Sequence, residues 1–211
     1  MVIAGHALGS AVVSKPEDNE VVIFHVLLYA GLRFEFNLVV IDILHLYDIY
    51  LHQLTPNAFV RLLVYMWICK TTKTKPSATG FASAHKVHHQ PKYFLEESVD
   101  GVVEKQAQFG YLNFVYCTGV ISPVAAYRNK WPIDWHQHWL YHEVEPEGNG
   151  EVNRLVTNKI EVLHQDYKVD LPPCPEGDAF ILMLRLFARK YNTRDIVEEY
   201  CVLGVWPVRR G

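Results

Sequence analysis

Three long runs of apolar residues, separated by polar or helix-breaking positions, dominate the first half of the chain. We predict helices over residues 21–30, 38–50 and 56–70, where apolar side chains leave only narrow polar stripes. Thr55-Pro56 is the strongest start signal, because a capping hydroxyl and a proline at the first helical position both favour a helix N-terminus. A weaker helix is expected over 77–90.

The spacing of apolar residues changes after position 105, where β-branched and aromatic residues become common. Segments 111–117 and 120–127, joined by Thr118-Gly119, predict a β-hairpin. A further strand is expected in the second half of 130–142, and helices follow after residue 178. This order of helices, strands and helices is typical of an α+β protein.

The expected architecture is an N-terminal bundle of about four helices, a central antiparallel hairpin or small sheet, and C-terminal helices. Residues 1–20 are predicted to be a flexible tail, because they end in a polar cluster and show no hydrophobic periodicity. Residues 21–208 are predicted to form a single domain, with a helical half over 21–92 and a mixed half over 105–208. Residues 209–211 would be a short second tail.

The composition is that of a folded protein. Half of the 211 residues are hydrophobic and 13% are aromatic, so the chain can bury a sizeable core. The net charge of −3 argues against a surface that is basic throughout. The apolar runs fall well short of the roughly 20 residues that span a bilayer, so we expect an intracellular protein, in the nucleus or cytoplasm. The four cysteines share no C-x-x-C spacing, which indicates reduced thiols.

Three phrases in the chain together resemble a known family. They are Leu51-His52-Gln53-Leu54-Thr55-Pro56-Asn57, Tyr127-Arg128-Asn129-Lys130-Trp131-Pro132-Ile133-Asp134-Trp135, and Trp139-Leu140-Tyr141-His142. The set resembles the gypsy-type transposase domain found in many plant genomes and associated with long-terminal-repeat retroelements. The resemblance extends over roughly residues 21–208. It implies a transposable-element origin and brings no catalytic residues, because gypsy elements move through an RNA copy and use an integrase.

Motifs for retroelement enzymes are absent from the sequence. It has no Asp-Ser/Thr-Gly of an aspartic protease, no adjacent aspartates of a reverse transcriptase, and no zinc knuckle. Phosphate-loop, serine-hydrolase and zinc-protease motifs are also missing. We therefore expect no cofactor and lean against an enzyme. An acidic, metal-dependent transposase or nuclease site built by the fold stays open.

Aromatic and basic side chains form the candidate binding residues. Three tryptophans recur every four residues, next to two cations, and three lysines occupy the loop after the third helix. These residues are Trp131, Trp135, Trp139, Arg128, Lys130, Lys70, Lys73 and Lys75. The tryptophans could stack single-stranded bases or pack in a core or partner interface. The lysines could contact phosphates or keep the loop solvated.

Histidines are the candidate zinc ligands. His85, His88 and His89 would share one face of a helix, and His136 and His138 would lie on the same side of a strand. Three or four such nitrogens could bind Zn²⁺. Because no cysteine lies at ligand spacing and the clusters are far apart in sequence, we predict no metal site.

Three functional hypotheses follow. The first is a non-catalytic, gag-like module that acts by self-association or by binding a protein partner. The second is a nucleic-acid-binding module that uses the tryptophan-rich segment, and the third is the metal-dependent transposase or nuclease. A decayed copy without a function of its own stays open as well.

Overall fold

A computed structural model describes residues 2–6, 20–30, 32, 38–89, 93–97, 103–107, 112–125, 131–132, 135, 138–143, 171, 174, 177–187, 191–192 and 196. Its helices are α1 (His25–Tyr29), α2 (Leu38–Leu46), α3 (Pro56–Thr72), α4 (Ala78–Ala84) and α5 (Gly177–Leu186), with a 3₁₀ turn at Leu51–Gln53. Its strands are β1 (Val2–His6), β2 (Glu20–Phe24), β3 (His85–His89), β4 (Tyr93–Glu97), β5 (Val103–Ala107), β6 (Leu112–Tyr116), β7 (Val124–Ala125), β8 (His138–Glu143) and β9 (Tyr191–Asn192). The predicted α+β class is confirmed.

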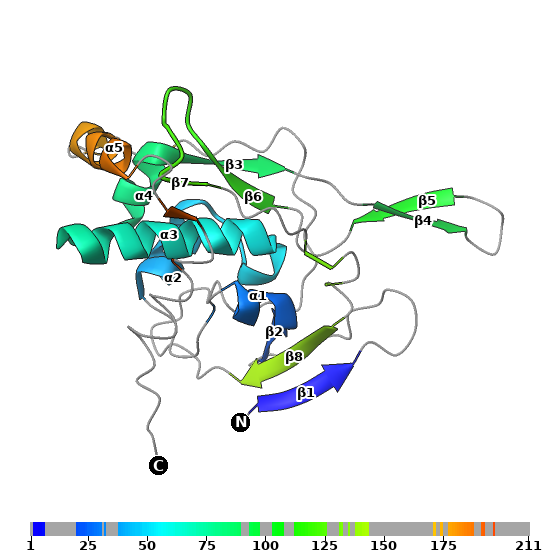
Figure 1. The fold of residues 1–211 in the computed structure, drawn as a ribbon. Helices are drawn as coiled ribbons and strands as arrows, with labels where there is room; N and C mark the ends of the chain where they lie inside the picture. The colour runs from blue at the N-terminus through cyan, green and yellow to red at the C-terminus, as the bar shows by residue number, and fades with distance from the viewer. Residues whose placement is uncertain are drawn as a thin grey trace, which may run out of the picture.

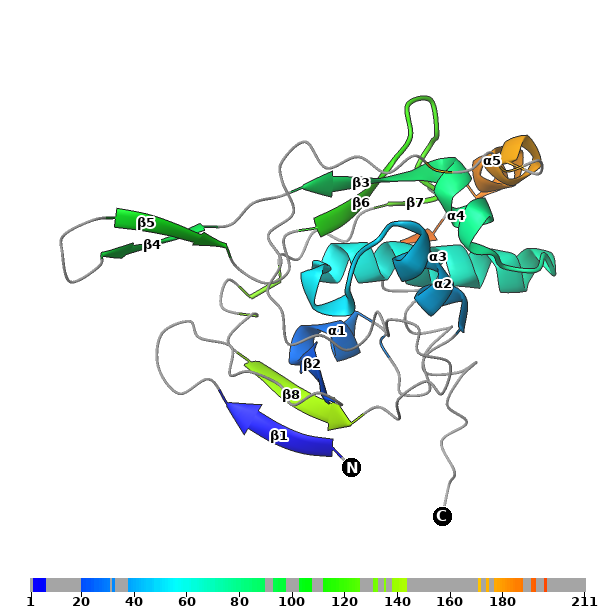
Figure 2. The same cartoon turned by 180° about the vertical axis from the view of Figure 1, so that it is seen from behind.

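Helix α3 lies at the centre of the body (Figure 1). Every residue from Leu62 to Cys69 is buried, so the helix is covered around its whole circumference. The antiparallel ribbon β3–β6 lies on one side of it, and α1 with the antiparallel sheet β1–β8–β2 lies on the other (Figures 1 and 2). The apolar run that predicted this helix therefore forms the middle of the core.

The start of α3 is capped as predicted. The Thr55 hydroxyl accepts a hydrogen bond from the backbone N–H of Ala58 at 3.1 Å, and Pro56 is the first helical residue. We expect Thr55→Ala to lower the free energy of unfolding by about 1 kcal/mol, because one helix donor loses its partner. Urea denaturation of both proteins measures this difference. Thr71→Ala in α3 is a comparison variant, because the Thr71 hydroxyl donates to the carbonyl of Trp67 in the same helix and caps no helix start.

An aromatic cluster joins the helices to the β3–β6 ribbon. Phe81 of α4 makes edge contacts with Tyr65, Tyr47 and Phe114, at ring distances of 5.4, 6.2 and 4.9 Å. The Tyr65 hydroxyl donates to the carbonyl of Ser77 at 2.7 Å and accepts from its N–H at 2.8 Å. These contacts tie α2, α3, α4 and β6 into one core.

Two predicted helices are shorter in the structure, because a strand takes the place of part of each. Residues Glu20–Phe24 form strand β2, so the helix expected over 21–30 is reduced to α1. The helix expected over 77–90 is correct only for α4, because His85–His89 is strand β3. The 21–92 half of the chain is therefore not purely helical. In both cases hydrogen bonding to a distant strand, β8 or β6, overrides local helix propensity.

The predicted hairpin over 111–127 is wrong in its pairing. A turn does occur at Cys117–Val120, with Gly119 at φ +83°, as a type II turn requires. However, β6 pairs with β3, and β7 pairs in parallel with β9. The tail predicted over 1–20 also needs correction, because Val2–His6 pairs with β8 as strand β1.

The predicted strand in the second half of 130–142 is confirmed as β8. The helix predicted from residue 178 is confirmed as α5, with Asp178 in its first turn. Most of residues 194–201, in the region where a further C-terminal helix is expected, lie outside the described residues. The tail 209–211 lies outside them as well.

Candidate interaction surface

Two of the three candidate tryptophans are part of the core. Trp135 is 6% exposed and Trp139 is 1% exposed. The Trp135 ring meets the edge of Phe24 at 5.1 Å, with an interplanar angle of 84°. A base cannot stack on a ring whose faces are already covered by protein, so their burial favours core packing over base stacking.

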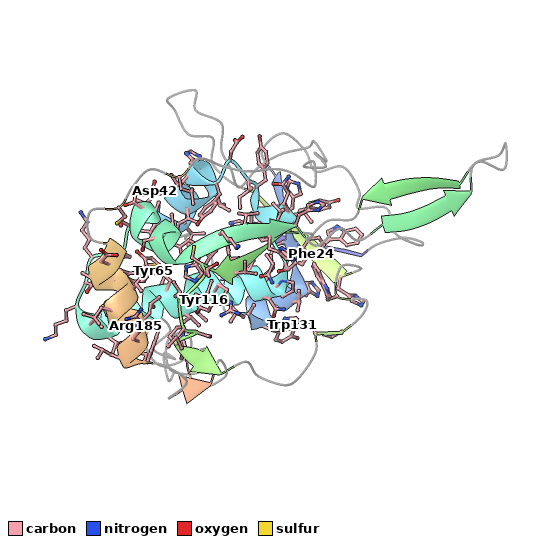
Figure 3. The ribbon with its side chains drawn as sticks, turned by 90° about the horizontal axis from the view of Figure 1, so that it is seen from above. Phe24, Asp42, Tyr65, Tyr116, Trp131 and Arg185 are labelled. Atoms are coloured by element: carbon pink, nitrogen blue, oxygen red, sulfur yellow. The ribbon has the colours of Figure 1, made fainter. Side chains whose placement is uncertain are left out.

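Trp131 is half-buried near the start of α3. Its indole N–H donates to the side-chain oxygen of Asn57 at 2.9 Å. Figure 3 places it well away from Arg185 of α5. Arg128 and Lys130, predicted to flank it, lie outside the described residues.

The lysine loop, defined as Lys70, Lys73 and Lys75, lies at the opposite end of α3, and all three side chains are exposed. Lys73 adopts the left-handed conformation that ends the helix, at φ 56°. Thirteen residues of helix separate Asn57 from Lys70, which is about 20 Å at 1.5 Å per residue. The fold thus does not bring the lysine loop and Trp131 into one site. Cations here also complement the negative end of the helix dipole.

The histidines lie differently from the predicted helical face. Residues His85–His89 form β3, where alternation places His85 and His89 on one side and His88 on the other. His85 is buried, and burial lowers its pKa to about 3. His138 is exposed and its ring stacks on His25 at 6.4 Å, and His136 is not described. Among the side chains that the structure describes, no three potential ligands form a metal site.

A polar cluster that the sequence did not indicate links α3 to β6. The Arg61 guanidinium lies 4.4 Å from the centre of the Tyr116 ring, and it donates to the Ser122 hydroxyl at 3.5 Å. Burial raises the pKa of Tyr116, and the nearby Arg61 partly offsets this. On the paired strand β3, the His85 ring lies 4.6 Å from the Tyr116 ring. These contacts hold α3 against the ribbon, which is a structural role.

Helix α5 packs on the body through one apolar face. Phe180 meets the edge of Tyr65 at a ring distance of 5.1 Å, and Phe187, just after the helix, meets Trp67 at 5.4 Å. Leu184, between them, is 1% exposed. At the start of the helix, a Cβ on Gly177 would lie 3.1 Å from Ser83 of α4, so the two helices approach closely there.

A second apolar face of α5 is more exposed, although Met183 at its edge packs partly against the core. This outer face consists of Ala179, Leu182, Met183 and Leu186, at helical spacings i, i+3, i+4 and i+7. Leu182 is 60% exposed and Leu186 is 64% exposed. The Met183 sulfur lies 3.6 Å from the Thr74 hydroxyl, so the lysine loop borders this face. Exposed Arg185 adds a further cation in the last turn.

The sequence could have shown this outer face, since its spacing is visible there. What the sequence could not show is that the other face, through Phe180 and Leu184, is the buried one. No helix in the described ranges has the length and apolar character needed to cross a membrane.

The fold and surface define an α+β protein with an exposed apolar helix face beside a basic loop. Residues 21–88 match the model of the family described as "Putative gypsy type transposon", which confirms the resemblance for that segment. The matched residues cover most of β2, all of α1 to α4 and most of β3. Searches among curated proteins and solved structures gave no match. Helix α5 and the tryptophan-rich segment lie outside the matched residues.

Proposed function

We propose that this transposon-related chain is a non-catalytic assembly module, in which copies associate through the outer face of α5. The observation that carries the proposal is the pair of exposed leucines, Leu182 and Leu186, one turn apart on a helix already anchored by its other face. Amphipathic helices that bind proteins present anchors at this i, i+3, i+4, i+7 spacing.

The free energy gained by burying these two leucines is modest, so other contacts of the face must add to it. Fully burying a leucine contributes about 1.5–3 kcal/mol, so covering the exposed parts of Leu182 and Leu186 contributes about 2–4 kcal/mol together. Clustered apolar side chains rimmed by polar ones are characteristic of protein contact sites. The lysine loop and Arg185 supply such a rim.

Sedimentation velocity over a wide range of protein concentration tests the proposal. We expect the wild-type chain to form larger species as concentration rises, and Leu182→Ser/Leu186→Ser to stay monomeric. Leu38→Ser is the matched control, because Leu38 is a leucine that is 74% exposed on α2. A wild-type chain that is monomeric throughout, or serine variants that associate normally, would overturn the proposal.

A second candidate function is nucleic-acid binding, favoured by the three exposed cations of the lysine loop. With Trp135 and Trp139 buried, it would rest on phosphate contacts rather than on base stacking. Fluorescence anisotropy with labelled single-stranded RNA and duplex DNA, titrated with salt, tests it. Binding that weakens with salt and disappears in Lys73→Glu/Lys75→Glu supports this function, and no binding at low salt excludes it.

A further inference from the structure

The hairpin β4–β5 lies apart from the rest of the protein. In Figures 1, 2 and 3 it extends from the body on the side opposite to α5. Its two antiparallel strands pair with each other and with no third described strand. A two-stranded hairpin is marginally stable in water unless another surface covers it, and its outer edges carry backbone groups without strand partners.

The residues of this hairpin are acidic and apolar. Its strands contain three glutamates, Glu96, Glu97 and Glu104, and a single lysine, together with the apolar run Tyr93-Phe94-Leu95. Glu96 lies directly opposite Glu104 in the register. Like charges in opposite positions destabilise a strand pair, so the hairpin would gain stability from cations brought between them.

The α5 region has the complementary chemistry. Its outer face offers Leu182 and Leu186 to apolar side chains. The lysine loop borders that face at Met183, and exposed Arg185 lies next to Leu186 in the sequence. The exposed carboxylate of Asp178 lies in the first turn of α5, at the other end of the helix from Arg185. Leu186 therefore lies at the basic end of the helix, and Leu182 lies between the two ends.

We propose that the β4–β5 hairpin of one copy docks on the outer face of α5 and the lysine loop of a second copy. This inference rests on the proposed function and names the occupant of that face. Because the hairpin and α5 lie on opposite sides of the body, one chain cannot cover its own α5 in this way. The contact is therefore head-to-tail, and such contacts extend into open chains or close into rings.

The charge of the hairpin provides the first test. Glu96→Gln/Glu104→Gln removes two negative charges and also the repulsion between the strands, so unfolding of the hairpin would not explain a loss of association. We expect association about tenfold weaker than in the wild type, measured by sedimentation velocity at moderate salt. Asp42→Lys on α2 is the control, because it changes the net charge by the same amount at an exposed site outside the hairpin. Unchanged association of the glutamine variant would overturn the inference.

Mixing two variants provides the decisive test. The hairpin variant Glu96→Gln/Glu104→Gln keeps an intact α5 face, and the face variant Leu182→Ser/Leu186→Ser keeps an intact hairpin. Each alone is expected to be largely monomeric at concentrations where the wild type associates. Mixed in equal amounts, with one of them fluorescently labelled, they should form a heterodimer that does not grow further, because its remaining two surfaces are both defective.

The outcomes separate this inference from the proposed function. If the hairpin variant alone associates as the wild type does, the contact is between two α5 faces; the inference is then overturned and the proposed function stands. A wild type that associates, with a mixture that stays monomeric, also overturns the inference. If the wild type never associates, both are overturned. A heterodimer in the mixture, together with larger species for the wild type, supports both.

Discussion

Replacing Trp139 by alanine is expected to lower the free energy of unfolding by about 3–5 kcal/mol. The side chain is 1% exposed, and it lies on β8, the central strand of the β1–β8–β2 sheet. There it is opposite Gly5 on one neighbouring strand and Phe24 on the other. Removing the indole leaves a cavity between elements that are far apart in sequence. Urea denaturation followed by far-ultraviolet circular dichroism measures the loss.

Trp131→Ala is the matched control for this prediction, since it removes the same side chain from the same segment at a half-buried position. It should cost less, because it breaks one hydrogen bond to Asn57 and removes less buried surface than the loss of Trp139 does. Equal, small losses for both variants would contradict the buried position of Trp139. They would also make the predicted base stacking by this segment plausible again.

The central helix could be predicted because its signals are local. The cap of Thr55 involves a residue three positions away, and the buried run from Leu62 to Cys69 is continuous in the sequence. A helix closes its own backbone hydrogen bonds, so neither signal depends on the rest of the fold. The same reasoning explains why α4 was predicted from Ser77 onward, where the Ser77 hydroxyl accepts from the N–H of Gly80 at 3.1 Å.

Strands β2 and β3 could not be predicted in the same way, because their partners are distant. Strand β2 pairs with β8, more than a hundred residues later, and β3 pairs with β6. The β-branched residues Val21, Val22 and Ile23 did carry a local strand signal. The apolar run continuing to Ala30 masked that signal, since a continuous run fits a buried helix equally well.

The candidate surface shows a related limit of sequence reasoning. Tryptophans and lysines were selected as residue types suited to binding, yet burial separates Trp139 from Lys73, which is exposed at the far end of α3. Conversely, the helical spacing of Leu182 and Leu186 is visible in the sequence, but their exposure is not. Only the packing of Phe180 against Tyr65 identifies the buried face and thus leaves these leucines outside.

Stability is expected to fall by about 4 kcal/mol between pH 7.5 and pH 5 because of two buried histidines. Burial lowers the pKa of His52 to about 3 and that of His85 to about 3. An unfolded histidine has a pKa near 6.5, so between these values the unfolded state binds the extra protons. The stabilisation is complete above pH 6.5 and is lost as the pH falls toward 3, by about 1.4 kcal/mol per pH unit for each histidine. Such a loss is large for a domain whose total stability is about 5–15 kcal/mol.

His85→Gln tests the contribution of one histidine to this pH dependence. The Nδ1 atom of His85 lies 2.9 Å from the carbonyl oxygen of Phe81, and because a carbonyl only accepts, Nδ1 carries the hydrogen of the neutral ring. The ring also stacks on Phe81 at 4.1 Å, and the nearby Arg61 further lowers its pKa, so a second cation is disfavoured there. Urea denaturation at a series of pH values should show that the slope of the unfolding free energy against pH is reduced by about half in His85→Gln.

The exposed His88 on the same strand gives the matched variant His88→Gln, which should leave this slope unchanged. If the two variants have the same slope, His85 is protonated without penalty and the tight packing around it does not control the acid stability of the fold.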